Sequence, residues 1–392
     1  MPLKVALLTA GKDPHYALGL APALADLGIE VEVVGNSEME AFPGVRHPNI
    51  RFLNLIGDQS SADSSFRKVR RVLAYYVRLL RFAIRSESTV FHILWPNKFV
   101  YFDRTLLNLY YRALGKKLVF TAHNVNTEDR DQRDSRLNRT SLRIQYHLMR
   151  HVFVHTSEMQ KALSADYGIP LEKLTVLTFP VNNVTPRTAL TRETARTALN
   201  LGPREKVILF FGNIAPYKGL DVLVQALPEL RSRLGAFRVL VVGGIKKGER
   251  DYFEHVNTMI EQLKVSDLID QKIGYLEEEH VELYLKAADV LVLPYKRIFQ
   301  SGVLFLAYSF GLPVVATDAG SLREEIIEGE TGFICRRDDP ADLAEQIARY
   351  FKSELFAGLA ARRSWIINHA NTNYSWERLA AKTRQIYEGT GA

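Results

Sequence analysis

Two short segments of the chain have the residue types that bind phosphate groups. In the first, an apolar run at 207–211 is followed by Gly212 and then by Lys218 and Gly219, which stand directly before an amphipathic stretch at 220–230. The run is typical of a buried strand and the stretch of a helix. Free N–H groups at a helix start and a lysine ammonium group both attract an anion, and a turn with little side-chain bulk lets the anion come close. We therefore predict a diphosphate site at this turn.

The second segment repeats this arrangement further along the chain. The apolar run 290–294 is followed by Ser301 and Gly302, which lead into a predicted helix at 303–310. The free N–H groups of this helix would point at the same anion. Beside the first turn, Asn213 could donate a hydrogen bond to a phosphate oxygen but brings no charge. A departing diphosphate gains negative charge as its bond breaks, so donors arranged around it would stabilise the transition state of a group transfer.

A run at 307–317 is similar to a known family signature. The pattern is Ala-x-x-x-Gly-x-Pro-Val-Val-Ala-Thr, and its positions are matched by Ala307, Gly311, Pro313, Val314, Val315, Ala316 and Thr317. With Lys218 and Gly219, this run resembles the retaining glycosyltransferases of family 4, group 1, which have the GT-B fold. The resemblance covers nearly the whole chain and is strongest in the second half. It implies two doubly wound Rossmann-like α/β domains facing a cleft, with a C-terminal helix that crosses back to the first domain.

The resemblance also implies a reaction and a set of roles. The chain would transfer a sugar from a UDP- or GDP-linked donor to a hydroxyl group of a glycan or lipid-linked acceptor, in polysaccharide or glycolipid synthesis. The anomeric configuration would be retained, and no metal or other cofactor would be needed. The donor nucleoside would lie by Tyr275, Leu276 and Val303, and Gln300 is the candidate for holding the donor sugar. The diphosphate would be held by Asn213, Lys218, Gly219, Ser301 and Gly302.

Three positions depart from the family pattern. Asn213 stands where the family usually has an arginine, and Ile298 and Leu306 stand where it has two carboxylates that contact the donor. Two other functions therefore stay open: a nucleotide-sugar-binding subunit that has lost catalysis, and a nucleotide-sugar epimerase with the GT-B fold. An epimerase would need acid and base residues that the sequence does not identify. Lys218, the two phosphate-binding turns and the loop with His123 and Asn124 favour an active transferase over both.

Short apolar runs alternate with helical stretches along the chain, which indicates two α/β domains. We predict an acceptor-binding domain at residues 1–185 with the C-terminal helix 374–392, and a nucleotide-sugar-binding domain at 186–373. The segment 179–203, with three prolines and few large apolar residues, is predicted to be the linker. The predicted strands are 5–9, 31–34, 90–94, 118–122 and 152–155 in the first domain, and 207–211, 239–242, 290–293 and 314–317 in the second.

The loops after the predicted strands of the first domain are the expected acceptor side. In open α/β sheets, ligands bind beyond the carboxyl ends of the strands. After the first strand, Gly11 would let the backbone approach a ligand, and Lys12 and His15 could face it. After the fourth strand, His123 and Asn124 stand at the strand end.

His123 is the histidine that we expect to act in the reaction. A lone histidine is more often structural, but its position at a strand end beside Asn124 favours a role in the site. We expect His123, Lys218 and Gln300 to contact the reacting groups. His92 lies inside an apolar run, and the sequence leaves open whether it belongs to the core or to the site.

The excess positive charge lies in the first half of the chain. Residues 1–185 contain 24 Lys and Arg against 17 Asp and Glu, whereas the remainder contains 27 of each, so the first half accounts for the net charge of +7. Much of the excess comes from segment 66–84, which has no acidic residue. In a helix the arginines fall within an arc of about 100°. On the opposite, expected core side lie Val69, Val72, Tyr76, Leu80 and Ala83. This arginine row consists of Arg67, Arg70, Arg71, Arg78, Arg81 and Arg85.

The arginine row has two competing interpretations. It could be the solvated face of a helix, or it could contact anionic lipid headgroups, where each basic side chain contributes about 1 kcal/mol. Nucleic acid is disfavoured, because no nucleic-acid-binding module accompanies the charge.

The remaining signals concern compartment and metal binding. The single cysteine, Cys335, rules out an internal disulfide and suits a reducing compartment. The first residues lack the pattern of an export signal, and no segment approaches the roughly 20 apolar residues of a membrane span. We therefore expect a cytoplasmic protein, either soluble or peripheral at the inner face of the membrane. Asp129 and Asp131 have the Asp-x-Asp spacing of metal-dependent transferases, but no apolar strand precedes them, so we expect no metal site.

Overall fold

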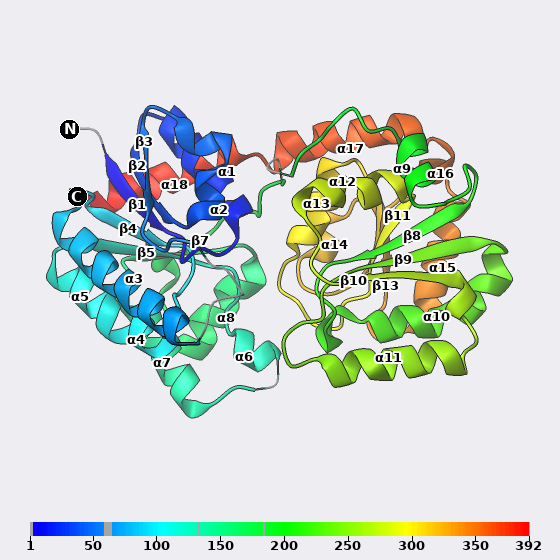
Figure 1. Cartoon of the computed structure of the whole chain (residues 1–392), viewed down its shortest axis with the longest axis horizontal. Helices are drawn as coiled ribbons and strands as arrows, with labels where there is room; N and C mark the ends of the chain where they lie inside the picture. The colour runs from blue at the N-terminus through cyan, green and yellow to red at the C-terminus, as the bar shows by residue number, and fades with distance from the viewer. Residues whose placement is uncertain (1–2, 59–64, 132, 183–184, 392) are drawn as a thin grey trace. The chain divides into compact units, whose positions relative to one another are not determined.

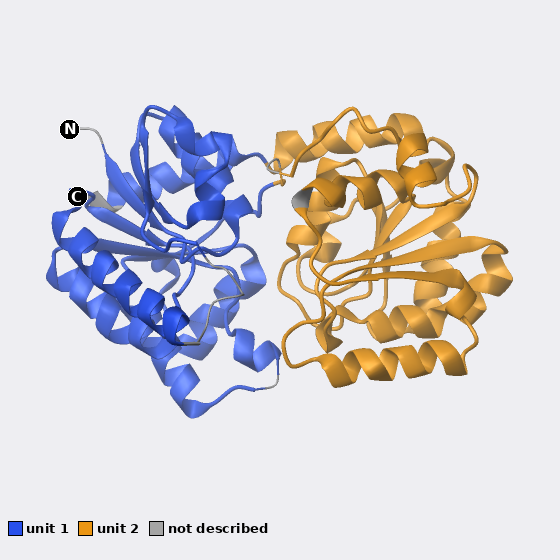
Figure 2. Cartoon of the chain, in the orientation of Figure 1, with its two compact units in different colours: residues 1–180, 375–392 blue, residues 181–374 orange. Residues whose placement is uncertain are grey.

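The chain folds into two compact units, shown in Figure 2. The structure is a computed structural model that describes residues 3–58, 65–131, 133–182 and 185–391. Unit 1 consists of residues 1–180 and 375–392, and unit 2 of residues 181–374. Each unit has its own parallel sheet with helices packed against it (Figure 1). The acceptor and nucleotide-sugar roles assigned to residues 1–185 and 186–373 stay predictions.

Unit 1 has a seven-stranded sheet among its described residues, with the order β3-β2-β1-β4-β5-β6-β7. Every pairing is parallel. The strand order reverses between β1 and β4, and this reversal is where a ligand crevice opens in a doubly wound sheet. The strands are β1 (Lys4–Leu8), β2 (Glu30–Gly35), β3 (Ile50–Asn54), β4 (Val90–Ile93), β5 (Lys117–Ala122), β6 (His151–Val154) and β7 (Leu174–Val176).

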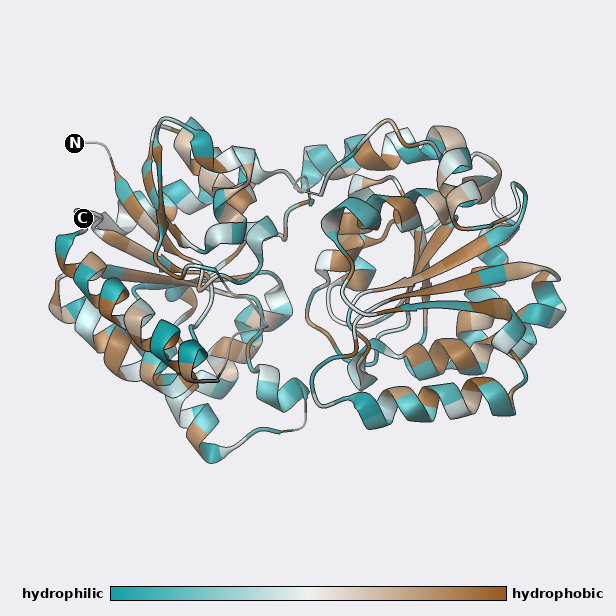
Figure 3. Ribbon diagram, in the orientation of Figure 1, coloured by the Kyte–Doolittle hydropathy of each residue, from teal (hydrophilic) through white to brown (hydrophobic). Residues whose placement is uncertain are grey.

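Unit 2 has a six-stranded parallel sheet among its described residues, with the order β10-β9-β8-β11-β12-β13. Here the order reverses between β8 and β11. The strands are β8 (Lys206–Phe211), β9 (Phe237–Gly243), β10 (Ile269–Ile273), β11 (Val290–Leu293), β12 (Val314–Thr317) and β13 (Gly332–Cys335). The central strands of both sheets are apolar (Figure 3), as expected when helices cover both faces of a parallel sheet.

The helices follow the strands in alternation. Those of unit 1 are α1 (Pro14–Asp26), α2 (Ser37–Glu40), α3 (Ser65–Arg85), α4 (Val100–Phe102), α5 (Asn108–Ala113), α6 (Thr127–Arg130), α7 (Arg136–Leu148), α8 (Ser157–Tyr167) and α18 (Trp376–Gly391), with the π-helical turn η2 (Asp103–Leu107) and the 3-10 turns η1 (Pro43–Arg46) and η3 (Leu171–Lys173). Those of unit 2 are α9 (Arg192–Ala198), α10 (Leu220–Leu234), α11 (Arg250–Gln262), α12 (Glu278–Ala287), α13 (Gly302–Ser309), α14 (Leu322–Glu325), α15 (Pro340–Phe351), α16 (Glu354–Ala357) and α17 (Leu359–Asn373), with the 3-10 turns η4 (Pro216–Lys218) and η5 (Ser266–Leu268).

The last helix, α18, packs on α1 and belongs to unit 1. Gly19 of α1 makes this contact possible, because a Cβ atom there would lie 2.1 Å from the ring of Trp376. Near the end of the helix, the Tyr387 hydroxyl is hydrogen-bonded to Nδ1 of His92 at 2.5 Å, and Nε2 of His92 is bonded to Thr121 Oγ1 at 2.7 Å. His92 is 1% exposed, so it belongs to the core. The predicted two-domain α/β class and the returning C-terminal helix are confirmed.

The nine predicted strands are present, and the four that sequence reasoning missed are β3, β7, β10 and β13. All four are edge strands of their sheets. An edge strand is paired on one side alone and its sequence can be mixed, as in IRFLN of β3 and IDQKI of β10. Such runs do not show the continuous apolar pattern of the central strands.

The predicted linker 179–203 is wrong in part, because it contains helix α9. The reason is a buried ion pair: Nη2 of Arg196 lies 2.8 Å from Oδ2 of Asp289, and Arg196 is 2% exposed. The same carboxylate accepts a hydrogen bond from the backbone N–H of Val207 at the start of β8. This segment is therefore anchored to the core of unit 2.

Helix α3 contains the predicted arginine row, and its apolar residues do not all face the core. Tyr76 and Ala83 are buried as expected, but Val69 is 58% exposed, so its predicted core position is wrong. Phe66, Leu73, Val77 and Ile84 are also exposed. The helix therefore has an exposed apolar row beside its arginines. None of the described helices combines the length and apolar character needed to cross a bilayer.

Candidate active site

The turn after β8 brings Lys218 against the strand ends of unit 2. Gly212 follows the strand with φ of 110°, and Gly219 follows η4 with φ of 69°, both in a region that glycine adopts without strain. A Cβ atom on Gly219 would lie 1.8 Å from the carbonyl oxygen of Pro294, so the close approach of the two loops requires glycine. Helix α10 begins at the next residue, Leu220. The predicted strand, turn and helix start are all present.

The second turn lies against the first through Tyr295. Nζ of Lys218 is 2.6 Å from the Tyr295 hydroxyl, which in turn accepts a hydrogen bond from Ser301 Oγ at 3.3 Å. Helix α13 begins at Gly302, directly after Ser301. The two turns follow β8 and β11, the pair of strands at which the sheet order reverses. Lys218, the N-terminus of α13 and Ser301 thus lie together at the ligand-binding edge of the sheet.

Tyr295 is the residue of this site that sequence reasoning missed. It is fully buried, and the ammonium group of Lys218 also lies 4.1 Å from the centre of its ring. Burial raises the pKa of its hydroxyl well above the usual range, so the group stays protonated. The signal in the sequence was its position, two residues after the last residue of β11.

The other predicted donor residues lie on several elements of unit 2. Val303 lies beside Gly212, since a Cβ atom added to that glycine would lie 3.6 Å from Cγ2 of Val303. The Gln300 amide nitrogen is buried and has no hydrogen-bond partner among the described residues. Asn213 is exposed, and Tyr275 is 83% exposed with Leu276 half-buried beside it in the chain.

The two apolar positions that replace the family carboxylates differ in burial. Leu306 is 8% exposed inside α13, whereas Ile298 is half-buried in the loop after β11. Gly320 has φ of 56°, and a Cβ atom added to it would lie 2.3 Å from the carbonyl oxygen of Ile298. The backbone of this loop is therefore packed closely against the turn after β12, with apolar side chains where the pattern has acids.

In unit 1, His123 lies in a cluster of rings. It stacks on Trp95 with 4.2 Å between ring centres, meets Tyr16 edge-on at 4.7 Å, and its Nδ1 is 3.2 Å from Nε2 of His155. Nδ1 of His155 lies 3.0 Å from the carbonyl oxygen of Leu177 and must donate to it. His155 Nε2 therefore accepts, and His123 Nδ1 donates to it.

This tautomer leaves Nε2 of His123 as a hydrogen-bond acceptor. The atom is buried and has no partner among the described residues. Burial, followed by the neighbouring His155, holds the pKa of His123 well below its usual range, so the ring is neutral at pH 7. A neutral imidazole with a free acceptor nitrogen can accept a hydrogen bond from a ligand hydroxyl group.

The remaining acceptor-side residues lie in the loops after β1 and β5. Gly11 has φ of 65°, and its N–H donates to Thr9 Oγ1 at 3.0 Å. Lys12 donates from Nζ to the carbonyl oxygen of Pro96 at 2.7 Å, and His15 is half-buried at the start of α1. Oδ1 of Asn124 accepts from the N–H of Asn126 and shapes its own loop. Their contacts with an acceptor stay predictions.

The described residues contain no group of three or more His, Cys, Asp or Glu side chains that could hold a metal ion. Asp131 pairs with Arg130 at 3.0 Å, and Asp129 belongs to the short helix α6. The expectation of a metal-independent reaction rests on the sequence and stays a prediction.

Two family models match the two halves of the chain. "Glycosyltransferase Family 4" matches residues 15–182 and "Glycosyl transferases group 1" matches residues 205–353. The D-inositol 3-phosphate glycosyltransferase of Corynebacterium diphtheriae is 25% identical over 402 residues, covering 96% of this chain and 90% of the relative. The enzyme of the same name from Streptomyces bingchenggensis is 30% identical over 243 residues, which span 60% of this chain and about half (52%) of that relative.

Solved structures share the fold. The sucrose-phosphate synthase of Thermosynechococcus elongatus is 19% identical with a TM-score of 0.71, over 99% of this chain and 98% of that one. Anabaena HepE in complex with UDP-glucose is 17% identical with a TM-score of 0.74, over 99% of this chain and all of that one. At these identities the likeness establishes the architecture alone.

Proposed function

This chain belongs to the glycosyltransferases of family 4, group 1, and we propose that it transfers a sugar from a UDP- or GDP-linked donor to a hydroxyl acceptor, with retention and without a metal. The observation that carries the proposal is the hydrogen-bonded chain from Lys218 through Tyr295 to Ser301 at the strand-order reversal of unit 2. It supports a diphosphate site with one cation and one helix N-terminus.

The chemistry of this site is stabilisation of the leaving group. As the glycosidic bond breaks, negative charge grows on the diphosphate. Lys218 and the N–H groups at the start of α13 would stabilise this charge, and they need not move to do so. Tyr295 holds the ammonium group in place. The unpartnered amide nitrogen of Gln300 is available to donate to a hydroxyl of the donor sugar. A UDP or UDP-sugar donor agrees with the UDP complexes of the Anabaena relative, and a GDP donor remains an outcome of the test.

The acceptor is proposed to be a glycan or a lipid-linked molecule at the inner, cytoplasmic face of a membrane. Helix α3 supports this surface contact, because its exposed apolar row of Phe66, Leu73, Val77 and Ile84 runs along the same helix as the arginine row. Apolar side chains beside basic ones are the composition of a helix that lies in the headgroup region of an anionic bilayer.

Salt-dependent vesicle binding tests the membrane contact. Replacing exposed Arg70, Arg78 and Arg81 by glutamate should abolish co-sedimentation with vesicles containing phosphatidylserine, and raised salt should weaken wild-type binding because the Debye length shortens from about 8 Å. The control is a triple glutamate variant of Arg112, Arg136 and Arg150, which are exposed in unit 1 outside α3 and give the same change in net charge. Equal loss in both variants would refute a specific contact at α3.

A nucleotide-sugar-binding subunit without catalysis is the second candidate. The observation in its favour is the pair of apolar residues, Ile298 and Leu306, at the two carboxylate positions. This candidate predicts donor binding without turnover, whereas an epimerase would change the sugar nucleotide without an acceptor.

One experiment separates these functions. The purified chain is incubated with labelled UDP- and GDP-sugars and with D-inositol 3-phosphate, glucose or a membrane lipid extract, and the products are separated by chromatography. The proposal predicts release of nucleoside diphosphate together with a labelled glycoside. Binding of the donor without any such product would contradict it.

A further inference from the structure

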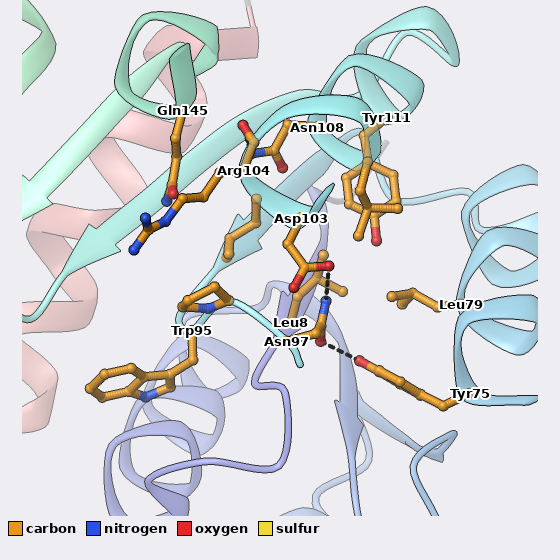
Figure 4. Close-up of a pocket in the computed structure, with 13 residues that line it drawn as sticks. Leu8, Tyr75, Leu79, Trp95, Asn97, Asp103, Arg104, Asn108, Tyr111 and Gln145 are labelled. Atoms are coloured by element: carbon orange, nitrogen blue, oxygen red, sulfur yellow. Dashed lines mark hydrogen bonds between the residues drawn. The ribbon is translucent and has the colours of Figure 1, made fainter. Parts of the chain in front are cut away.

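A small pocket with a mixed polar and apolar lining lies in unit 1 beside the carboxyl ends of β1 and β4. Leu8 of β1 and Ile93 of β4 belong to its lining. The π-helical turn η2 supplies Asp103 and Arg104 (Figure 4). The strand order of unit 1 reverses between β1 and β4, which is where ligands bind in doubly wound sheets. Single π-helical turns also recur at functional sites. The pocket is thus at the expected edge of the sheet for a ligand.

Five buried polar atoms of the pocket wall have no hydrogen-bond partner among the described residues. Nearly all buried polar groups in proteins are hydrogen-bonded, because an unpaired one loses its bonds to water. Five such atoms around one pocket therefore mark a place where bound water or polar groups of a ligand can be hydrogen-bonded. They are Nε1 of Trp95, Oδ2 of Asp103, Nε of Arg104, the hydroxyl of Tyr111 and Oε1 of Gln145.

The groups that bear these atoms are already held in position. Oδ1 of Asp103 accepts from the Tyr76 hydroxyl at 2.8 Å and from Nδ2 of Asn97 at 3.4 Å, which leaves Oδ2 unpaired. Figure 4 shows the Asp103–Asn97 contact and the Tyr75 hydroxyl bound to the other side of the Asn97 amide, at 2.6 Å. Asp103, Tyr111 and Gln145 are each at least 96% buried. Such fixed groups lose little freedom when a ligand binds.

Arg104 is fixed in the same way from α7. Its Nη1 donates to Oδ1 of Asn138 at 2.7 Å and to Ser141 Oγ at 3.1 Å, so Nε is the atom left toward the pocket wall. Trp95 joins the pocket to the candidate acceptor loop, since its ring stacks on His123 while its N–H belongs to the unpaired set.

The size and chemistry of the pocket fit a hydroxyl group. Its enclosed space is about 20 Å³, enough for one oxygen-sized group. The unpaired set contains donors on Trp95 and Arg104, acceptors on Asp103 and Gln145, and a hydroxyl on Tyr111 that can do either. A hydroxyl group both donates and accepts hydrogen bonds. A phosphate oxygen only accepts them, and the negative charge of the Asp103 carboxylate would repel it. Burial raises the pKa of Asp103 to about 6, so at pH 7.5 Oδ2 is an acceptor for an O–H.

We propose that this pocket binds one hydroxyl group of the acceptor through Asp103 and Tyr111, so that the acceptor is a polyhydroxylated ring, a sugar or a cyclitol. The inference rests on the proposed function, because it names the acceptor class of the same reaction. In this proposal the ring of the acceptor lies outside the pocket, beside the half-buried side chain of Trp95.

Two substitutions test the pocket without disturbing its frame. Asp103→Asn keeps Oδ1 and its two hydrogen bonds and exchanges Oδ2 for a donor. Tyr111→Phe removes a hydroxyl that has no hydrogen-bond partner among the described residues, so the melting temperature should stay equal or rise. The matched control is the neighbouring Tyr110→Phe, whose hydroxyl donates to the carbonyl oxygen of Leu80 at 3.0 Å, outside the pocket.

Kinetics with the acceptor found among D-inositol 3-phosphate, glucose and the lipid extract provide the readout. The Tyr111 variant should raise the KM for the acceptor about tenfold and the Asp103 variant more, while the KM for the donor and its slow hydrolysis by water stay unchanged. Tyr110→Phe should leave all three values unchanged.

The outcomes separate the inference from the proposed function. If wild type transfers to none of these acceptors, the proposed function fails and the acceptor pocket with it. If wild type transfers but both pocket variants keep the acceptor KM within twofold, the pocket holds a structural water only and the inference alone is wrong. An acceptor with a single isolated hydroxyl group would also overturn it.

Discussion

Replacing Lys218 by methionine should abolish most of the turnover while the protein stays folded. Methionine keeps an apolar stem in the buried site and removes the ammonium group, whose contacts include the hydrogen bond to Tyr295 and positions near the rings of Tyr295 and Tyr217. A hydrogen bond from a charged ammonium group is worth about 1.5–3 kcal/mol and a cation–π contact about 0.5–2 kcal/mol, so together they amount to less than the stability of about 5–15 kcal/mol that a typical domain has.

The effect on the reaction should be larger than the effect on folding. Loss of one preorganised donor to a developing oxyanion lowers kcat by about 100-fold to 1,000-fold, or about 3–4 kcal/mol. The assay is release of nucleoside diphosphate at saturating donor and acceptor, with thermal unfolding measured in parallel. The matched control is Lys206→Met, because Lys206 stands at the other end of β8 and donates to the carbonyl oxygen of Leu234. A Lys218 variant with kcat within threefold of wild type would refute the assignment of this turn to the leaving group.

Two further predictions follow from buried groups. Tyr295→Phe should lower kcat about tenfold with less effect on donor affinity, because Lys218 and Ser301 lose the hydroxyl group that lies between them. Steady-state kinetics measure kcat, and calorimetry with UDP measures the affinity. An unchanged kcat would contradict a positioning role for Tyr295. Burial lowers the pKa of His92 to about 3, of His155 to about 4 and of His123 well below 6.5, so below pH 6.5 the unfolded state binds protons that the native state does not. The part of the stability that depends on these three histidines should therefore be full above pH 6.5 and fall toward pH 4, by up to about 1.4 kcal/mol per pH unit for each. Asp103 and Glu325, whose pKa values burial raises to about 6 and about 8, act in the opposite direction over part of this range. The direct test is an NMR titration of the histidine rings, in which all three should stay neutral at pH 5.5; protonation of any of them near pH 6.5 would contradict their neutral burial.

The sequence predicts the central part of the fold well. Strands such as β4 and β11 are buried on both faces, so their continuous apolar runs are visible without a structure. The edge strands and α9 were missed because their sequences contain no continuous apolar run. What stabilises α9 is the pair of Arg196 and Asp289, which stand 93 residues apart, and a long-range ion pair of this kind has no local signal.

The candidate sites were predictable to different extents. Lys218 and Ser301 were found because a phosphate site needs a helix start and a basic residue close in sequence. Tyr295, which joins them, was missed because a buried tyrosine after a strand resembles any core aromatic. The pocket at Asp103 was missed altogether, since its polar atoms come from the loop after β4 and from η2, α5 and α7 and meet through the fold alone. The exposure of Val69 on α3 likewise depends on which neighbours cover the helix.

A crystal structure of the full chain with UDP or GDP, whichever nucleotide binds more tightly, tests the central claim most directly. The account predicts the diphosphate within hydrogen-bond distance of Nζ of Lys218 and of the backbone N–H groups at Ser301 and Gly302, at the ends of β8 and β11. A diphosphate bound elsewhere in the chain, or binding that Lys218→Met leaves unchanged, would contradict it.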